Sequence, residues 1–385
     1  MKEKLWNKPF TTLLFISVIK SVSLTMITPV LTKHAMQLGA SLAAAGTIAG
    51  LFAFAALFSR PASGIFADRI NHKYLLCVST GFMCLSIMLY SVTDSLPLLI
   101  FARILHGGAF SFSGTVIIAF TAAVIPKSRL GEGLGYQGAS YIFAMAAGPV
   151  LGLFIGEHYG FRMTFFASAV LIIAAVLIIL FLPNLRKPVL KNKKISRGDF
   201  ISLKLLPLAL IGGLFSLFNG ITASFLILLG DERGIYNIGI YFTVNAICLL
   251  IIRSLAGKLI DRKSLGVILI PCLFIAAVAA VFIGSAASIG MIIAAAVLKA
   301  IGQGSGQPAV QTACMKMLPA EKSGLAASTF YIGADLGQGF GPMLGGAVSG
   351  LWGYSVMFYC CAGFLLCGII IFNVYNKILN RSAKA

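Results

Sequence analysis

The chain has 385 residues, of which 59% are hydrophobic and only 11% are charged. Soluble domains usually carry about 25% charged residues, so this composition excludes an ordinary soluble domain and indicates a membrane protein. The net charge of +19 raises the question of a nucleic-acid partner. The placement of the basic residues explains that charge better, and no nucleic-acid partner is expected.

Apolar stretches of about 20 residues are long enough to cross a bilayer as helices. An all-α membrane protein with twelve transmembrane helices is therefore predicted. In chain order, the expected spans are residues 9–31, 42–66, 74–92, 96–124, 132–156, 162–183, 205–229, 235–256, 266–286, 288–315, 324–349 and 354–376.

The basic residues predict the orientation of the chain. With a cytoplasmic N-terminus, 24 of the 30 Lys and Arg residues fall on inner loops, tails or inner helix ends. This bias follows the positive-inside rule and places both termini in the cytoplasm. The longest basic run, within residues 185–200, then lies on the inner side, where it can approach anionic lipid. The remaining six are Lys33, Arg162 and Arg233 outside, and Lys20, Arg103 and Lys299 within the membrane.

Neither a cofactor nor a metal site is indicated. The eight cysteines all fall within the expected spans, so their spacing suggests neither disulfides nor a metal site. The segment GLGYQG (133–138) matches a dinucleotide-binding glycine pattern, but it opens a membrane helix instead of following a strand.

Two halves of the chain repeat at a constant offset. RPASGIFADR (60–69) returns as RSLAGKLIDR (253–262), and GPVLG (148–152) returns as GPMLG (341–345), with the same spacing between the copies. Such a repeat predicts a duplicated bundle, with two pseudo-symmetric six-helix halves at 1–184 and 205–385 and a basic linker at 185–204. The repeated pairs include Arg60 and Arg253, Gly64 and Gly257, Asp68 and Asp261, Arg69 and Arg262, Gly148 and Gly341, Pro149 and Pro342, and Gly152 and Gly345.

These segments resemble motifs of the major facilitator superfamily. GIFADRINHK (64–73) resembles its signature loop, with Asp68 and Arg69 followed by a basic tail ending in Lys73, although Asn71 and His72 stand where the family often has glycine and arginine. FARILHGGAF (101–110) resembles its arginine-containing motif. GASYIFAMAAGPVLG (138–152) and GADLGQGFGPMLGG (333–346) resemble the Gly-Pro segments of its proton-coupled exporters. The resemblance covers essentially the whole chain.

The Gly-Pro segments have two interpretations. Glycines four residues apart let a neighbouring helix backbone approach closely, and a proline removes a backbone donor and kinks its helix. A special role in closing an exporter and plain helix packing both remain open. In the signature loops, repeated acid–arginine pairs at helix ends are expected to break and re-form as the bundles rock.

Three charged residues are expected near the bilayer midplane. Asp335 and Lys20 each lie eleven residues from the inner start of their spans, and Lys299 lies eleven residues from the outer start of its span. That distance is about 16 Å along a helix. Charged residues at this depth usually face a cavity or each other. Asp335 is therefore interpreted either as a proton carrier or as the buried partner of Lys299.

The resemblance implies that spans one, four, seven and ten line a central cavity. Arg103 and His106, three residues apart on the fourth span, share a helix face. Asp335 with Arg103 is expected to serve proton coupling, while a structural role for His106 and the amides remains an alternative. The expected substrate contacts are Lys20, Arg103, His106, Asn219, Lys299 and Gln303.

The expected function is secondary active transport by a monomer in the plasma membrane. The resemblance implies proton-coupled export of a small organic compound by alternating access. Three cations against one acid favour an anionic or zwitterionic substrate. An uptake symporter or uniporter for an anionic metabolite is the alternative, and a polytopic membrane enzyme or a lipid-handling protein is a more distant one.

Overall fold

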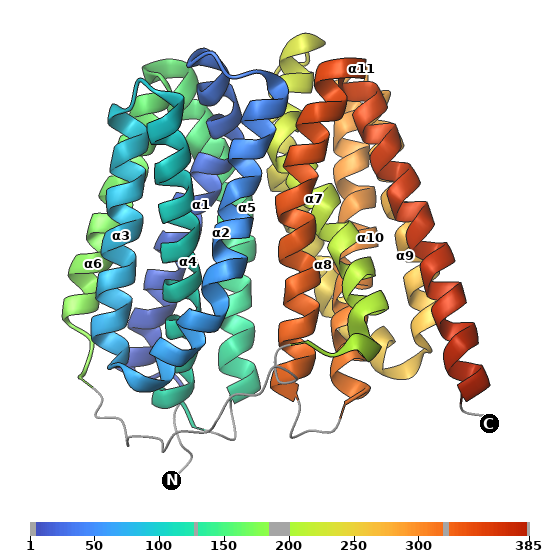
Figure 1. Cartoon of the computed structure of the whole chain (residues 1–385), viewed down its shortest axis with the longest axis horizontal. Helices are drawn as coiled ribbons and strands as arrows, with labels where there is room; N and C mark the ends of the chain where they lie inside the picture. The colour runs from blue at the N-terminus through green and yellow to red at the C-terminus, as the bar shows by residue number, and fades with distance from the viewer. Residues whose placement is uncertain (1–4, 127–129, 185–200, 319–322, 383–385) are drawn as a thin grey trace. The chain divides into compact units, whose positions relative to one another are not determined.

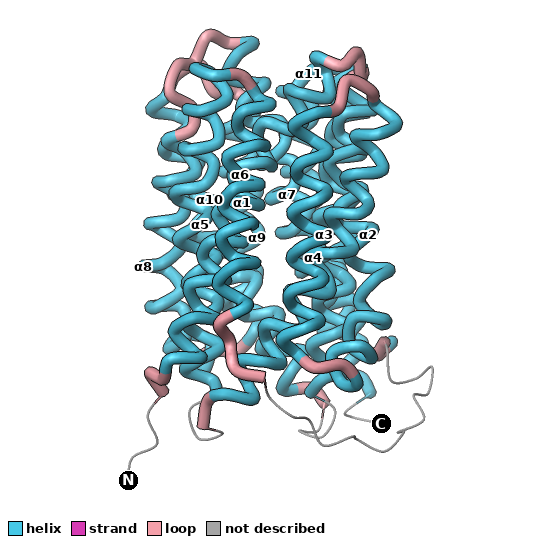
Figure 2. Tube along the Cα trace, turned by 90° about the vertical axis from the view of Figure 1, so that its left-hand side faces the viewer, coloured by secondary structure: helices cyan, strands magenta, loops and turns pink. Residues whose placement is uncertain are grey.

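The computed structural model describes residues 5–126, 130–184, 201–318 and 323–382. Within its helices, the side chains of residues 68–69, 130–132, 134–135, 254–262, 323–324, 327–328 and 379–382 lie outside the described set. The described residues are almost entirely helical and contain no strand, as Figure 2 shows. The all-helical prediction is confirmed.

The helices can be followed in chain order from blue to red in Figure 1. A single turn of 3-10 helix, η3 (Leu203–Leu205), precedes α7. The helices are α1 (Lys8–Gln37), α2 (Leu42–Arg69), α3 (His72–Val92), α4 (Leu96–Val124), α5 (Leu130–Tyr159), α6 (Phe161–Leu180), α7 (Leu206–Glu232), α8 (Ile240–Arg262), α9 (Leu265–Gly284), α10 (Ile289–Lys316) and α11 (Ser323–Ser382).

Ten helical stretches within the described residues are long and apolar enough to cross a membrane. α8 contributes a shorter apolar stretch, Ile240–Arg253. α11 is 60 residues long and runs through both of the last two predicted spans. It is interrupted at Gly353, whose φ of 80° and ψ of 169° are not helical.

The chain forms two compact units. Unit 1 comprises Met1–Ala40 and Leu51–Lys193, and unit 2 comprises Ser41–Gly50 and Lys194–Ala385. Residues 185–200 of the expected linker lie outside the described residues.

Two glycines show the repeat in the backbone itself. Gly160 precedes α6 with a φ of 86°, and Gly353, its counterpart in the sequence repeat, has a φ of 80°. Residues with a Cβ rarely adopt this left-handed region, so each position favours glycine. Both glycines stand between two helical segments, at corresponding positions of the sequence repeat.

Close helix packing in unit 1 depends on glycines of α5. A Cβ atom added at Gly148 would overlap the Thr25 side chain of α1, and one at Gly152 would overlap the Met26 backbone. Thr25 adds a hydrogen bond from its hydroxyl to the Ala144 carbonyl oxygen at 2.8 Å. Because no side chain separates the two helices at these points, their backbones lie almost in contact.

The equivalent glycines of α11 pack against α7 in unit 2. A Cβ at Gly341 would meet the backbone of Leu217, and one at Gly337 would overlap the backbone of Gly213. Gly345 instead faces side chains, among them Phe225. The first and fifth helices of unit 1 thus pack in the same way as α7 and the first segment of α11.

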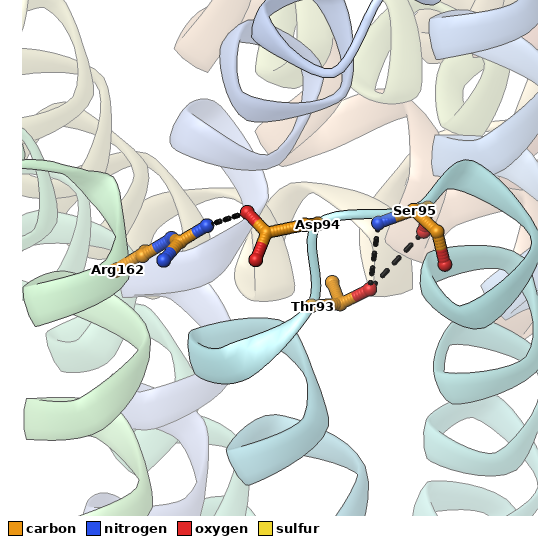
Figure 3. Close-up of polar contacts among 4 residues, drawn as sticks. All are labelled: Thr93, Asp94, Ser95 and Arg162. Carbon is orange, nitrogen blue, oxygen red and sulfur yellow. Dashed lines mark hydrogen bonds and ion pairs between the residues drawn. The ribbon is translucent and has the colours of Figure 1, made fainter.

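An arginine holds the connection between α3 and α4 in unit 1. Arg162, at the start of α6, forms an ion pair with Asp94 in that connection, as Figure 3 shows. The Thr93 hydroxyl beside it accepts a hydrogen bond from the Ser95 backbone N–H at 3.2 Å. The arginine and aspartate side chains are 53% and 75% exposed, so the pair contributes at most about 1 kcal/mol.

In unit 2 a different arginine binds the equivalent loop, which connects α9 and α10. Arg233, just after α7, donates to the Ala286 carbonyl at 2.5 Å and to the Gly284 carbonyl at 2.7 Å. It also donates to the hydroxyl of Ser355 at 2.6 Å. Ser355 is the repeat counterpart of Arg162, so the same joint is made in both units by unrelated residues.

Many large apolar side chains are exposed along the helices. In water, a protein seldom exposes such long continuous apolar faces, whereas lipid accommodates them. With the ten long apolar stretches, these faces identify an integral membrane protein. On α3 and α6 they include Val78, Phe82, Leu85, Phe166, Val170, Ile173 and Leu177, and on α9 and α11 they include Val267, Phe274, Leu366 and Ile370.

We predict that Gly152→Ala destabilises the protein by about 1–3 kcal/mol, the range for overpacked cores. The new methyl group would force α1 and α5 apart at Met26. Gly138→Ala is the matched control, because a Cβ at Gly138 on the same helix meets nothing within 4 Å. Thermal unfolding of both variants in detergent is the measurement, and equal stability of the two would contradict the close-packing argument.

Candidate functional site

Lys20 of α1 is buried inside unit 1. It is 6% exposed and donates from Nζ to the Ser113 hydroxyl of α4 at 2.5 Å. Ser113 in turn lies 3.3 Å from the sulfur of Met83 on α3. The ammonium group of α1 therefore contacts a hydroxyl of α4, which in turn contacts a thioether of α3.

Arg103 and His106 share one face of α4, as their spacing predicted. The Arg103 guanidinium carbon lies 4.6 Å from the centre of the Phe52 ring of α2. The same ring meets His106 edge to face, with ring centroids 5.1 Å apart. Nδ1 of His106 also lies 3.2 Å from the Tyr90 hydroxyl of α3. Arg103 and His106 are 3% and 0% exposed, so both groups are enclosed by α2 and α3.

His106 uses only one of its two ring nitrogens within the described residues. Its Nε2 is buried without a hydrogen-bond partner among them. Tyr90 connects Nδ1 to the Ala102 carbonyl oxygen, which accepts from the tyrosine hydroxyl at 3.4 Å. If Nδ1 carries the imidazole proton, the histidine donates to Tyr90 and Nε2 presents an acceptor lone pair.

Lys299 of α10 is the buried cation of unit 2. Its Nζ donates to the side-chain oxygen of Asn219 on α7 at 3.0 Å. The same nitrogen lies 5.5 Å from the centre of the Phe218 ring and 5.9 Å from that of Tyr241. Lys299 is 2% exposed, and these contacts come from α7 and α8.

These contacts offset part of the cost of burying an ammonium group. Moving such an ion out of water costs several kcal/mol in real proteins. A hydrogen bond to a charged group contributes about 1.5–3 kcal/mol, and a desolvated cation–π contact about 2 kcal/mol. The amide and the two rings thus make a charged Lys299 tolerable in this buried position.

A row of amides continues from this site. Asn219 donates from Nδ2 to the Gln338 side-chain oxygen of α11 at 3.4 Å. On α10, Gln303 donates to the Gln307 side-chain oxygen at 3.2 Å, and Gln307 donates to the Ser216 hydroxyl at 3.1 Å. All four amide side chains are partly exposed, in contrast to the buried Lys299.

Asp335 lies on α11 and is half-buried. It precedes Gln338 by three residues, so the two side chains share a helix face. Gln338 contacts Asn219, which places the carboxylate about one helical turn from the amide row. The Nζ of Lys299 hydrogen-bonds Asn219.

The signature loop of unit 1 is described only in part. Arg60 and Gly64 are half-buried on α2. Lys73 donates from Nζ to the Leu180 carbonyl at the end of α6, at 2.6 Å. In the unit 2 repeat, Arg253 is exposed on α8. The side chains of Asp68, Arg69, Gly257, Asp261 and Arg262 lie outside the described residues.

The two departures from the signature pattern have structural roles. Asn71 caps α3 by accepting from the Lys73 backbone N–H at 2.9 Å, and its side-chain amide donates to Asn184. His72 is buried and stacks on Phe120, with ring centroids 5.5 Å apart. These contacts attach the connection between α2 and α3 to α4 and to the segment after α6.

Sequence reasoning missed the residues that surround the predicted cations. Aromatic and hydroxyl side chains are common in any apolar helix, and nothing in their spacing marks them. Gln307, four residues after Gln303, and Gln338, three residues after Asp335, did carry a usable periodic signal. The missed residues are Phe52, Met83, Tyr90, Ser113, Ser216, Phe218, Tyr241, Gln307 and Gln338.

The described residues contain no group of three or more His, Cys, Asp or Glu side chains placed to hold a metal ion. The residues around Lys20, Arg103 and Lys299 provide buried positive charge and amide hydrogen-bonding groups. Asp335 adds a half-buried acid. Such groups suit the binding of a polar solute within a membrane.

Comparisons with known proteins place the chain in a family. The model of the Major Facilitator Superfamily matches residues 13–286 and 208–377. The chain is similar to the multi-drug resistance efflux pump PmrA of Streptococcus pneumoniae, at 26% identity over 98% of this chain and 99% of the pump. It is also similar to the multidrug resistance protein MdtG of Klebsiella pneumoniae, at 28% identity over 99% of this chain and 95% of that protein.

The fold also matches solved structures of transporters. The nucleoside transporter NupG superposes with a TM-score of 0.80 at 13% identity, covering 96% of this chain and 100% of that one. A POT family transporter in complex with 5-aminolevulinic acid has the same TM-score at 14% identity, covering 95% of each chain. These likenesses show the fold, and together with the family match they show that the chain belongs to the Major Facilitator Superfamily and is a membrane transporter, not an enzyme.

Proposed function

We propose that the protein is a proton-coupled exporter of a small anionic or zwitterionic organic compound. The observation that carries this proposal is the set of buried cations: Lys20, Arg103 and Lys299 are all buried within their helices. An anionic group on the substrate can compensate such charges, whereas a cationic substrate is repelled by them. The similarity to multidrug efflux pumps supports the export direction.

The proposed mechanism is alternating access between two six-helix halves. Here α11 counts as two helices divided at Gly353 and α8 as a full span, which gives twelve. The halves are 1–184 and 205–385, joined by the linker 185–204. Both termini are cytoplasmic, and the protein works as a monomer in the plasma membrane. The site opens inward, loads substrate, rocks, and releases it outward as a proton enters.

Individual residues have separate roles in this cycle. Asp335 takes up the proton, with Arg103 assisting. The substrate is contacted by Lys20, Arg103, His106, Asn219, Lys299 and Gln303. Uptake of an anionic metabolite is the second candidate, because buried cations would serve it equally well.

Asp68→Asn is expected to reduce transport severely while leaving membrane insertion intact. The acid recurs as Asp261 at a loop proposed to break and re-form its contacts during rocking. Transport rates are compared at matched membrane abundance with Asp94→Asn, the same chemical change at an exposed connection. Near-normal transport by Asp68→Asn and by Asp68→Asn/Asp261→Asn would rule out the switching role.

Lys20→Met and Lys299→Met are each expected to weaken binding of the true substrate by about 1–3 kcal/mol, the range for hydrogen bonds to charged groups. Lys33→Met and Lys316→Met, near the ends of the same two helices, are controls that change the net charge equally. Candidate substrates come from metabolite profiling of cells with and without the protein. Unchanged affinity in both midplane variants would argue against an anionic cargo.

Asp335→Asn is expected to abolish export driven by a pH gradient while preserving substrate exchange, because an amide cannot gain or lose the transported proton. Proteoliposomes with a defined pH gradient provide the measurement, and Asp94→Asn is the control. Lys299→Met is combined with it to test the ion-pair alternative. Gradient-driven accumulation by Asp335→Asn, alone or with Lys299→Met, would exclude Asp335 as the proton carrier.

A further inference from the structure

The amino group of Lys299 occupies a small cage inside unit 2, formed by Phe218, Asn219 and Tyr241. Nζ is 3.0 Å from the Asn219 side-chain oxygen. It is 5.5 Å and 5.9 Å from the centres of the Phe218 and Tyr241 rings. Aromatic faces combined with a carbonyl oxygen are the groups with which proteins bind organic ammonium ions.

The cage recognises positive charge with neutral groups. Among the described residues, an amide and two aromatic rings contact the ammonium, and the buried thiol of Cys361 also interacts with it electrostatically. Such a cage does not require that the cation belong to the protein. An ammonium group of similar size on a free molecule would meet the same oxygen and the same ring faces.

One side of the cage is more open than the others. Phe218 and Tyr241 are 0% and 1% exposed, and Lys299 itself is 2% exposed. Asn219, in contrast, is partly exposed and continues into the amide row through Gln338. A free ligand would therefore approach past the amide, towards the rings.

We propose that this cage is a binding site for a small primary ammonium ion, which the chain fills with its own Lys299. By occupying the site, Lys299 excludes cationic molecules from unit 2. The consequence for cargo selection rests on the proposed transport function, but the binding property of the cage does not.

Lys299→Ala tests this directly, because it removes Cγ, Cδ, Cε and Nζ together. The ion n-propylammonium contains the same atoms, and n-propanol is its neutral counterpart of equal length. Lys299→Met is the matched control, since it removes the charge but keeps the space filled. Lys299→Ala/Phe218→Leu removes one ring from the emptied cage.

Binding is measured by isothermal titration on the full chain in lipid nanodiscs, without a pH gradient. Lys299→Ala is expected to bind n-propylammonium at least about tenfold more tightly than n-propanol, which corresponds to about 1.4 kcal/mol. The wild type and Lys299→Met are expected to bind neither probe. Adding Phe218→Leu is expected to remove most of the preference for the cation.

Three results would overturn the proposal: no binding to Lys299→Ala, equal binding of both probes, or a preference that Phe218→Leu leaves unchanged. If Lys299→Ala folds poorly, the yield of folded protein purified with each probe decides instead. Recovery with n-propylammonium alone supports the cage, and recovery with neither or with both contradicts it. Because no gradient is used, failure of proton-coupled export in the Asp335→Asn experiments would leave this result unaffected.

Discussion

The constraint on which the rest of this structure depends is the cost of burying charge among apolar helices. A buried ammonium or guanidinium group loses several kcal/mol of hydration and must find partners nearby. Each of the three buried cations finds described contacts within its own unit. Lys20 uses a hydroxyl, Arg103 an aromatic face, and Lys299 an amide with two rings. Neutral partners leave the net positive charge in place, which is what an anionic solute would require.

Positions related by the sequence repeat carry different chemistry in the two units. Phe52 lies under Arg103 in unit 1, and at the two equivalent positions of unit 2 Asn245 donates to the Ala296 carbonyl at 3.0 Å. Equivalent positions on the second and fourth helices are therefore in contact in both units. In unit 1 the contact is a guanidinium on an aromatic ring, and in unit 2 it is a hydrogen bond from a neutral amide. His106 and Lys299 are likewise equivalent positions with different side chains. Close helix contacts at glycine keep the frame fixed, so polar residues inside it can change independently.

Sequence patterns predicted the frame better than the site. Apolar length was enough to locate most of the helices, and the constant offset was enough to find the repeat in the sequence, because each is a property of many residues together. Whether α11 is one helix or two depends on a single residue, Gly353. The sequence could indicate a break there only because Gly353 is the repeat counterpart of Gly160, which separates α5 from α6. The partners of Lys20 and Lys299 could not be predicted. Helices that are apolar all round leave their rotation unspecified, and a rotation of a fraction of a turn decides which neighbour a lysine reaches.

The two units handle their cations in ways that bear on selectivity. In unit 1 the guanidinium of Arg103 lies against Phe52, and the Nε2 of His106 has no hydrogen-bond partner among the described residues. In unit 2 the Lys299 ammonium is enclosed by neutral groups and reached through amides that are partly exposed. A flexible lysine can leave its amide and follow a bound anion, whereas a planar guanidinium stacked on a ring keeps its orientation. Under the proposed function, unit 2 would thus be suited to adapt to differing substrates, and unit 1 to hold a fixed positive charge.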